Sequence, residues 1–557
     1  MRMLLLIGID GATPDLVERL TSTGQMPNLR ALMRHGVYGH LQSSANLDPC
    51  CAWSSLLTGV NPGKHGVWGM QNLMPESYQW HPAHARMLRA PTLPQMLSER
   101  GHEAGTVFVP MTFPAREAEW TTVSGWLAPS SDAEGFAHPG RVASMAARKL
   151  RDVPLNVRVG PLAAAGRYQE ALEQAIEAMR GKAAFIEELL ADHRWDMLAV
   201  NFVELERMLR WCWHLFDRKH SSFREELYTA HGKIITQMHE EVDAIIGRLM
   251  EALEPDDYLL IVSGYGMGLN SRAALCVPEL MGYLDLFATR SSAEGLWHDL
   301  MSRSARLIDG ALETLQGILP AFLADMLPQP LEQEQPSRGE SDSWLDYERS
   351  WVIPAPGGHL YFHHENEFPH GIVSNGTSDR LSLQISSALQ TAIDPATGRR
   401  PLDWARDRER VCSGPFMNRL PHLVTRWDHK RVVEGLTATG RDGRVKVARP
   451  PAGRNSPGLP APEGIIIAAG KGLHSGVRIE GARVEDVAAT VMYLRGERVP
   501  TYFDGQVLRQ AFVDAMMSRH PIRTIERDLP RIVDDPARAE AASAVVAAHL
   551  RANGYDL

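Results

Sequence analysis

Residues 4–10 read LLLIGID, and this apolar run, which ends in Asp10, decides the fold of the chain. Strands that are buried on both faces of a parallel sheet read as unbroken apolar runs, whereas half-exposed strands alternate with polar residues. The run is far too short to cross a membrane, and it lacks the cleavage region of a secretion signal. We therefore expect a buried parallel strand with Asp10 at its carboxyl end.

Similar β-type runs recur along the chain, separated by amphipathic stretches with helical periodicity. This alternation predicts an α/β fold with a mostly parallel central sheet and helices on both faces. Ligand sites in such sheets form beyond the carboxyl ends of strands, so Asp10, Glu206 and Gly264-Tyr265 should converge. The further strands are expected at 105–109, 197–202, 258–263 and 464–469, and long helices at 165–192 and 222–253.

Composition divides the chain into five parts. We expect the first part of the α/β core at 1–285, a polar linker or insertion at 286–345, a turn-rich cap subdomain at 346–462, a return to the core at 463–515, and an Ala-rich helical tail at 516–557.

Charge and cysteine content exclude several classes of protein. The net charge is −9 and no dense Lys/Arg cluster is present, which argues against a nucleic-acid surface. The five cysteines are odd in number and form no paired CxxC spacing, so neither a disulfide framework nor a zinc knuckle is indicated. We expect a cytoplasmic protein that binds neither nucleic acid nor a membrane, and the oligomeric state stays open.

Four short motifs, spread from the start of the chain to its end, form one set. Residues 8–11 read GIDG, residues 26–29 MPNL, residues 53–66 WSSLLTGVNPGKHG and residues 504–508 DGQVL. Together they resemble the type I phosphodiesterase/nucleotide pyrophosphatase branch of the alkaline phosphatase superfamily, over nearly the whole chain. The resemblance implies an alkaline-phosphatase-like fold with an inserted cap, two metal ions held by six protein ligands, and a Thr or Ser nucleophile.

Most positions that the resemblance assigns to metal ligands are altered. The Asp of the first strand is kept as Asp10. The Asp of the following helix corresponds to Glu206, and its His, four residues on, to Arg210. The Asp-His pair after a later strand corresponds to Gly264 and Tyr265, and the late His falls in the stretch GRNSP, which contains none. Metals need three or four N, O or S donors, and a protonated guanidinium is not one, so we expect no metal and no cofactor.

Glu206 and Arg210 are spaced i, i+4 on the expected helix, so they share a face and are expected to pair. Two interpretations stand. Arg210 replaces a metal as the counter-charge for Asp10 and Glu206, or the two form a structural ion pair that fills an abandoned site. Tyr265 has the same two interpretations, as a general acid or as a ring that fills space.

The nucleophile position of the family corresponds to Pro49, which has no nucleophilic group. Asp48 and Pro49 predict an N-cap and the first residue of a helix. Cys50 then lies in the first turn, where the helix dipole lowers a thiol pKa. Cys50 is therefore a candidate nucleophile, and a small buried apolar residue is the alternative.

Four side chains are candidates for substrate binding. Asp48 and Cys51 flank the nucleophile position, and His65 belongs to the NPGKHG turn. His214 lies four residues after Arg210, on the same face of a continuous helix. A structural role is the alternative for both histidines.

Three functions remain open. The first is a metal-independent enzyme that uses the old cleft, with Asp10, Cys50, Glu206, Arg210 and Tyr265 as catalytic groups. The second is a non-catalytic protein that binds a ligand or a protein partner. The third is an active phosphodiesterase with unusual metal ligands. An arginine in the cleft favours a small anionic ligand.

Overall fold

The structure is a computed structural model that describes residues 2–288 and 345–552, except 117, 119, 441–442, 452–455, 531 and 533. The expected linker at 286–345 therefore lies almost entirely outside the described residues. Within these ranges, no helix is both long and apolar enough to span a membrane.

A nine-stranded sheet forms the centre of the larger part of the molecule, in the order β19-β2-β18-β9-β1-β8-β5-β6-β7. Its four central strands run parallel, and all four expected runs are confirmed to within one residue. They are β1 (Leu4–Ile9), β5 (Ala104–Val109), β8 (Met197–Phe202) and β9 (Tyr258–Val262).

The outer strands make the sheet mixed. The expected strand at 464–469 is present as β18 (Glu463–Ala469), but it runs antiparallel to both β9 and β2 (Val37–Gln42). An apolar run does not specify strand direction, which depends on where the preceding connection enters the sheet. The remaining strands are β6 (Thr121–Ser124), β7 (Ala137–His138) and β19 (Val477–Arg483).

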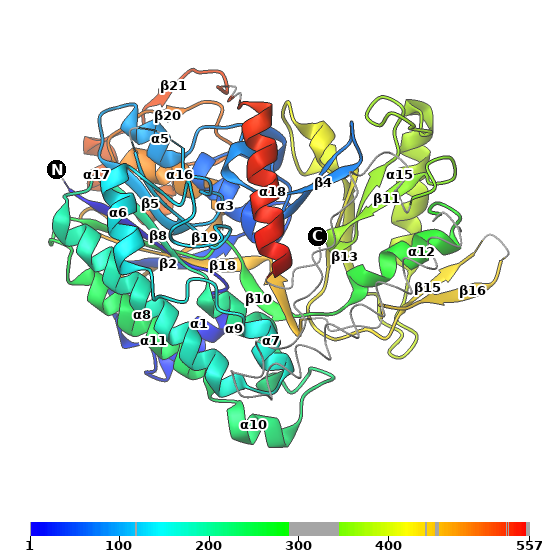
Figure 1. Cartoon of the computed structure of the whole chain (residues 1–557), viewed down its shortest axis with the longest axis horizontal. Helices are drawn as coiled ribbons and strands as arrows, with labels where there is room; N and C mark the ends of the chain where they lie inside the picture. Colours follow the sequence, from blue (N-terminus) through cyan, green and yellow to red (C-terminus); the bar gives the residue numbers. More distant parts are fainter. Residues whose placement is uncertain are drawn as a thin grey trace, which may run out of the picture.

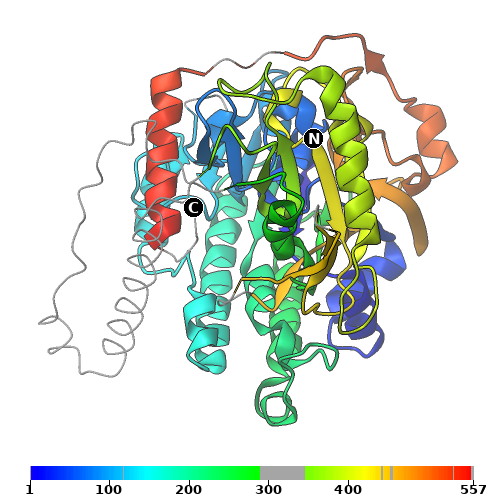
Figure 2. The same cartoon turned by 90° about the vertical axis from the view of Figure 1, so that its right-hand side faces the viewer.

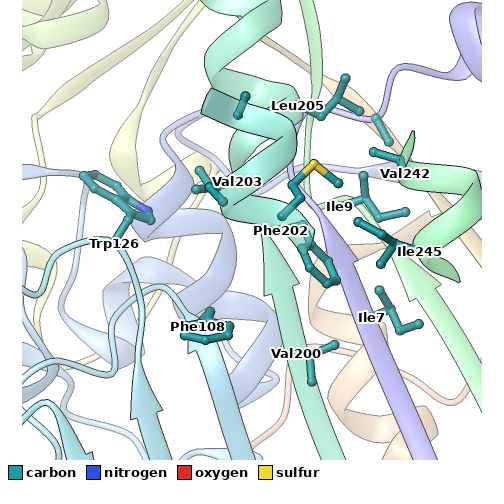
Figure 3. Packing of buried hydrophobic residues seen from close by; sticks show 14 of the residues in the cluster. Ile7, Ile9, Phe108, Trp126, Val200, Phe202, Val203, Leu205, Val242 and Ile245 are labelled. Carbon is teal, nitrogen blue, oxygen red and sulfur yellow. The ribbon is translucent and has the colours of Figure 1, made fainter. Parts of the chain in front are cut away.

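Helices cover both faces of the sheet, as expected (Figure 1). Alternate β1 residues supply the two cores. Ile7 and Ile9 point toward one face, where Val242 and Ile245 of α11 pack against them (Figure 3). That face carries α8 (Tyr168–Asp192), α9 (Glu204–Cys212) and α11 (Ile234–Met250), and the other carries α3 (Pro49–Thr58), α5 (Leu93–Ser98) and α16 (Val484–Leu494).

The single helix expected at 222–253 is two helices, α10 (Glu225–His231) and α11. Gly232 separates them, and a Cβ there would lie 2.6 Å from the Tyr228 carbonyl oxygen. The helix at 165–192 is confirmed as α8.

A smaller four-stranded sheet, in the order β11-β12-β14-β13, corresponds to the expected cap and lies on the right in Figure 1. It has its own apolar core, which includes Val277, Leu360 and Ile385. Helix α12 precedes residue 286 but packs here. The elements are α12 (Val277–Tyr283), β11 (Val352–Ala355), β12 (His359–Phe362), α15 (Asn375–Thr391), β13 (Leu402–Asp407) and β14 (Leu423–Trp427).

The tail ends in α18 (Pro536–Ala552), which lies against the outside of the core beside β4 (Gln79–Pro82) (Figures 1 and 2). The His549 ring bonds to the Trp126 carbonyl oxygen at 3.1 Å, and Ser543 bonds to His81 at 3.1 Å.

Candidate active site

Asp10 lies at the carboxyl end of β1 and is fully buried. Its Oδ1 accepts a hydrogen bond from Trp53 Nε1 at 2.8 Å, and its Oδ2 accepts one from Asn201 Nδ2 at 3.1 Å. Gly8 makes room for both donors, since a Cβ there would lie 2.4 Å from the Trp53 ring and 2.5 Å from Asn201 Oδ1. The glycine of the GIDG motif therefore lets an indole and an amide reach the aspartate.

Burial dominates the titration of this carboxyl group. Burial raises the pKa of Asp10 to about 7. The hydrogen bonds from Trp53 and Asn201 lower this pKa, and the charge of the nearby Glu206 raises it. Desolvation disfavours the charged form of any acid.

The pairing predicted for Glu206 and Arg210 is confirmed. Arg210 Nε donates to Glu206 Oε1 at 2.7 Å, and its Nη2 lies 2.5 Å from the same oxygen. The Glu206 side chain is 6% exposed and that of Arg210 22%, so the arginine is the more accessible partner. Arg210 places a permanent positive charge beside the first turn of α9.

Tyr265 and Gly264 follow β9 and face the same region. Tyr265 is fully buried, and burial followed by the charges of Asp10 and Glu206 raises the pKa of its phenol well above its ordinary value. The predicted convergence of Asp10, Glu206 and Tyr265 is therefore confirmed. A Cβ at Gly264 would lie 3.2 Å from the Cβ of Ala52, so apolar packing already fills the space of a side chain there.

The start of α3 has the predicted cap. The Asp48 side chain accepts a hydrogen bond from Cys50 N at 2.8 Å, and Pro49 opens the helix. The electrostatics differ from the expectation, because burial followed by the Asp48 charge raises the pKa of the Cys50 thiol well above its ordinary value. Burial also raises the pKa of Cys51 to about 12. Desolvation outweighs the helix dipole, so the surroundings of Cys50 do not favour a thiolate.

Cysteine labelling checks this point directly. All five cysteines are buried, so we expect a disulfide reagent such as Ellman's to titrate no thiol rapidly in the folded protein. All five are expected to react once the chain is denatured. Rapid single-site labelling of Cys50 in the folded protein would restore the nucleophile hypothesis, and a Cys50→Ala variant identifies the site.

The two candidate histidines have separate surroundings. His65 is fully buried, its Nε2 lies 3.0 Å from Ser55 Oγ, and burial lowers its pKa to about 3. His214 lies in a 3₁₀ turn after α9 has ended, 3.2 Å from Tyr168 Oη, and burial lowers its pKa to about 4. Of the hydrogen bonds between described residues, none joins either imidazole to Asp10 or Arg210.

Sequence reasoning missed a buried ion pair near Asp10. Lys182 Nζ of α8 lies 2.5 Å from Glu204 Oε1 at the start of α9 and 5.3 Å from the centre of the Phe108 ring. The side chains are 3% and 0% exposed. Burial lowers the pKa of Lys182, against the attraction of Glu204. One signal was present, since Lys182 continues the apolar stripe of α8 that contains Ala175, Ala178 and Met179.

The described side chains at the positions that the family resemblance assigns to metal ligands do not fit a dinuclear metal site. Asp10 and Glu206 are carboxylates, but internal N–H donors already bond to both. Arg210 carries a fixed charge that repels a cation, and Gly264 offers no donor. In the described part of the chain, no group of three or more His, Cys, Asp or Glu side chains is placed to hold a metal ion. The stretch GRNSP lies mostly outside the described residues.

Comparisons with known proteins agree with the motifs. A family model described as "Type I phosphodiesterase / nucleotide pyrophosphatase" matches residues 4–294, more than half of the 557 residues. No relative is found among curated proteins. Human ectonucleotide pyrophosphatase/phosphodiesterase 5 is 12% identical, covering 89% of this chain and 95% of that chain with a TM-score of 0.45. Phosphonoacetate hydrolase from Sinorhizobium meliloti 1021, in complex with phosphonoformate, is 13% identical, covering 87% and 94% with a TM-score of 0.45. Likenesses this distant do not bear on activity.

Proposed function

The chain belongs to the type I phosphodiesterase/nucleotide pyrophosphatase family, and we propose that it is a member that works without the dinuclear metal site. The Glu206–Arg210 ion pair beside Asp10 carries this proposal. A guanidinium, with one positive charge, lies at a position that the family resemblance assigns to a metal ligand, and it is bonded to one of the two carboxylates that remain.

As an enzyme, the protein would use the side chains around Asp10 and Arg210 for metal-independent acid–base chemistry. Arg210 is a charge clamp for a small anionic substrate, because a guanidinium donates paired hydrogen bonds to carboxylate or phosphate. Asp10 and Tyr265 are the acid–base groups beside it. No step is assigned to Cys50, since its thiol is buried and its pKa is raised.

A non-catalytic protein that binds an anionic ligand or a protein partner is the second candidate, and one observation favours it. Asp10, Cys50 and Tyr265 are all fully buried. Buried reactive groups are typical of a core that has closed over an abandoned site, in which case Arg210 is the group left for a ligand.

Metal content and hydrolysis test the proposal. After incubation with zinc and manganese and removal of the excess, we expect well below one ion per chain by mass spectrometry, because too few donors are present. We also expect no metal-dependent hydrolysis of bis-p-nitrophenyl phosphate. One or two tightly held ions together with hydrolysis would overturn the proposal and restore an active phosphodiesterase.

Two variants separate the two candidates. Turnover of p-nitrophenyl esters in the presence of a chelator, lost in Arg210→Gln and Asp10→Asn without a lower melting temperature, supports the enzyme. No turnover, but a rise in melting temperature with phosphate that Arg210→Gln removes, supports the binding protein. The exposed Arg410→Gln is the matched control for the loss of one positive charge.

A further inference from the structure

A groove lies beyond the amino ends of the central strands, opposite the end that carries Asp10. Its volume is about 590 Å³, within the range of small-molecule sites. Its walls come from the residues before β1, the start of β9, the end of α16, and α17 (Asp514–Arg519) with the segment that follows it. In Figure 1 this region is at the N-terminal end of the core, far from the smaller sheet.

The groove is separate from the candidate active site. Arg2 lines it just before β1, whereas Asp10 follows the other end of the same strand. Eight residue steps along an extended strand cover about 26 Å. A ligand in this groove therefore does not touch Asp10 or Arg210.

Positive charge gathers in the groove although the whole chain carries a net charge of −9. Arg2, Arg495, Arg519 and Arg523 line it, against one acidic residue, Glu497. The Glu497 carboxylate is already paired with two residues that do not line the groove, Arg100 (Nε at 3.2 Å) and His102 (Nε2 at 2.9 Å). Arg2 lies 3.7 Å from Asp256 and Arg495 lies 2.8 Å from Asp196, so the positive charge that no described carboxylate pairs with is that of Arg519 and Arg523.

Arg495 is the clearest sign of an incomplete site. Its side chain is only 3% exposed, and its Nη2 lies 2.8 Å from Asp196 Oδ1. Its Nε has no hydrogen-bond partner in the described part of the chain. A buried N–H without an acceptor is costly, which favours an added acceptor beside Arg495.

The rim adds two more accessible donors. Arg523 Nη2 donates to the Gly496 carbonyl oxygen at 2.7 Å, which fixes one edge of its guanidinium. Neither Arg519 nor Arg523 forms an ion pair with a described carboxylate, and both are exposed. Guanidinium groups recognise the flat, paired oxygens of phosphate and carboxylate.

We propose that this groove binds a small polyanion with two or more phosphate or carboxylate groups. One anionic group meets Arg495 at the floor, and another meets Arg519 and Arg523 at the rim. Separate cationic positions at the floor and the rim favour a multiply charged ligand over a single anion. This site is independent of the function proposed for the side chains around Asp10.

Isothermal titration calorimetry of the full chain tests the proposal at constant ionic strength, with inorganic pyrophosphate and citrate as probes. We expect binding of at least one probe, weakened about tenfold or more in the double variant Arg519→Gln/Arg523→Gln. Tighter binding of pyrophosphate assigns a phosphate ligand, and tighter binding of citrate a carboxylate ligand.

Two control variants make the result specific. Arg218→Gln/Arg410→Gln removes the same charge from exposed positions elsewhere and should leave the affinity unchanged. Arg210→Gln removes any binding of the probes at Arg210, so the binding that remains in this variant belongs to the groove. The proposal fails if neither probe binds, if the distant double variant weakens binding equally, or if Arg210→Gln alone removes all binding.

Discussion

Replacement of Lys182 by methionine is expected to lower the free energy of unfolding by about 3–5 kcal/mol, because it leaves the Glu204 carboxylate buried without its partner. The Lys182 and Glu204 side chains are 3% and 0% exposed, so water does not replace the lost ammonium. Glu204 Oε2 already lacks a hydrogen-bond partner among the described residues, so no second donor there stabilises the carboxylate when Lys182 is removed. Urea denaturation of the variant and the wild type at pH 7 measures the difference.

A more exposed pair, which also contains a residue of α8, provides the control. Arg180 of α8 and Glu241 of α11 form an ion pair at 2.6 Å with an arginine side chain that is 60% exposed. Arg180→Met is expected to cost less than about 1 kcal/mol, since water screens such pairs. The double variant Lys182→Met/Glu204→Leu should recover most of the loss, because no uncompensated charge remains. If Lys182→Met lowers the free energy of unfolding no more than Arg180→Met does, the prediction that an unpaired buried Glu204 is strongly destabilising is wrong.

Local sequence patterns were sufficient to predict the central strands, because burial constrains their composition. A strand buried on both faces must be apolar throughout, so β1, β8 and β9 are visible in the sequence without any knowledge of their partners. The direction of β18 was not predictable in this way, because it depends on the route of the chain through the smaller sheet. The Glu206–Arg210 pair was predictable because its i, i+4 spacing is local.

Long-range packing explains what the sequence did not show. Trp53 and Asn201 reach Asp10 only because Gly8 lets two distant elements approach β1. Cys50 lies at the start of a helix, where the helix dipole is expected to lower a thiol pKa. Burial by the rest of the fold raises the pKa of Cys50 instead. His214 does not lie on the predicted helix face, because α9 ends at Cys212, two residues before His214.

The effect of Asp10→Asn on stability is expected to depend strongly on pH. Burial raises the pKa of Asp10 from 3.8 to about 7, so the folded state holds this proton more tightly than the unfolded state. The stabilising contribution of the protonated group is complete below pH 4 and is lost as the pH rises through 7. The pKa difference corresponds to about 4 kcal/mol of unfolding free energy, and an amide at this position does not titrate.

The surroundings of Asp10 can accept that amide. Its oxygen can take the Trp53 hydrogen bond, and rotation of the Asn201 side chain offers Oδ1, which lacks a partner among the described residues, to the new N–H group. We therefore expect the difference in unfolding free energy, Asp10→Asn minus wild type, to rise by about 3–4 kcal/mol from pH 4 to pH 8. Urea denaturation at the two pH values measures it, with the exposed Asp514→Asn as the control whose difference should change little. An equal difference at both pH values would mean that Asp10 is ionised across the whole range, and that Trp53 and Asn201 outweigh its burial.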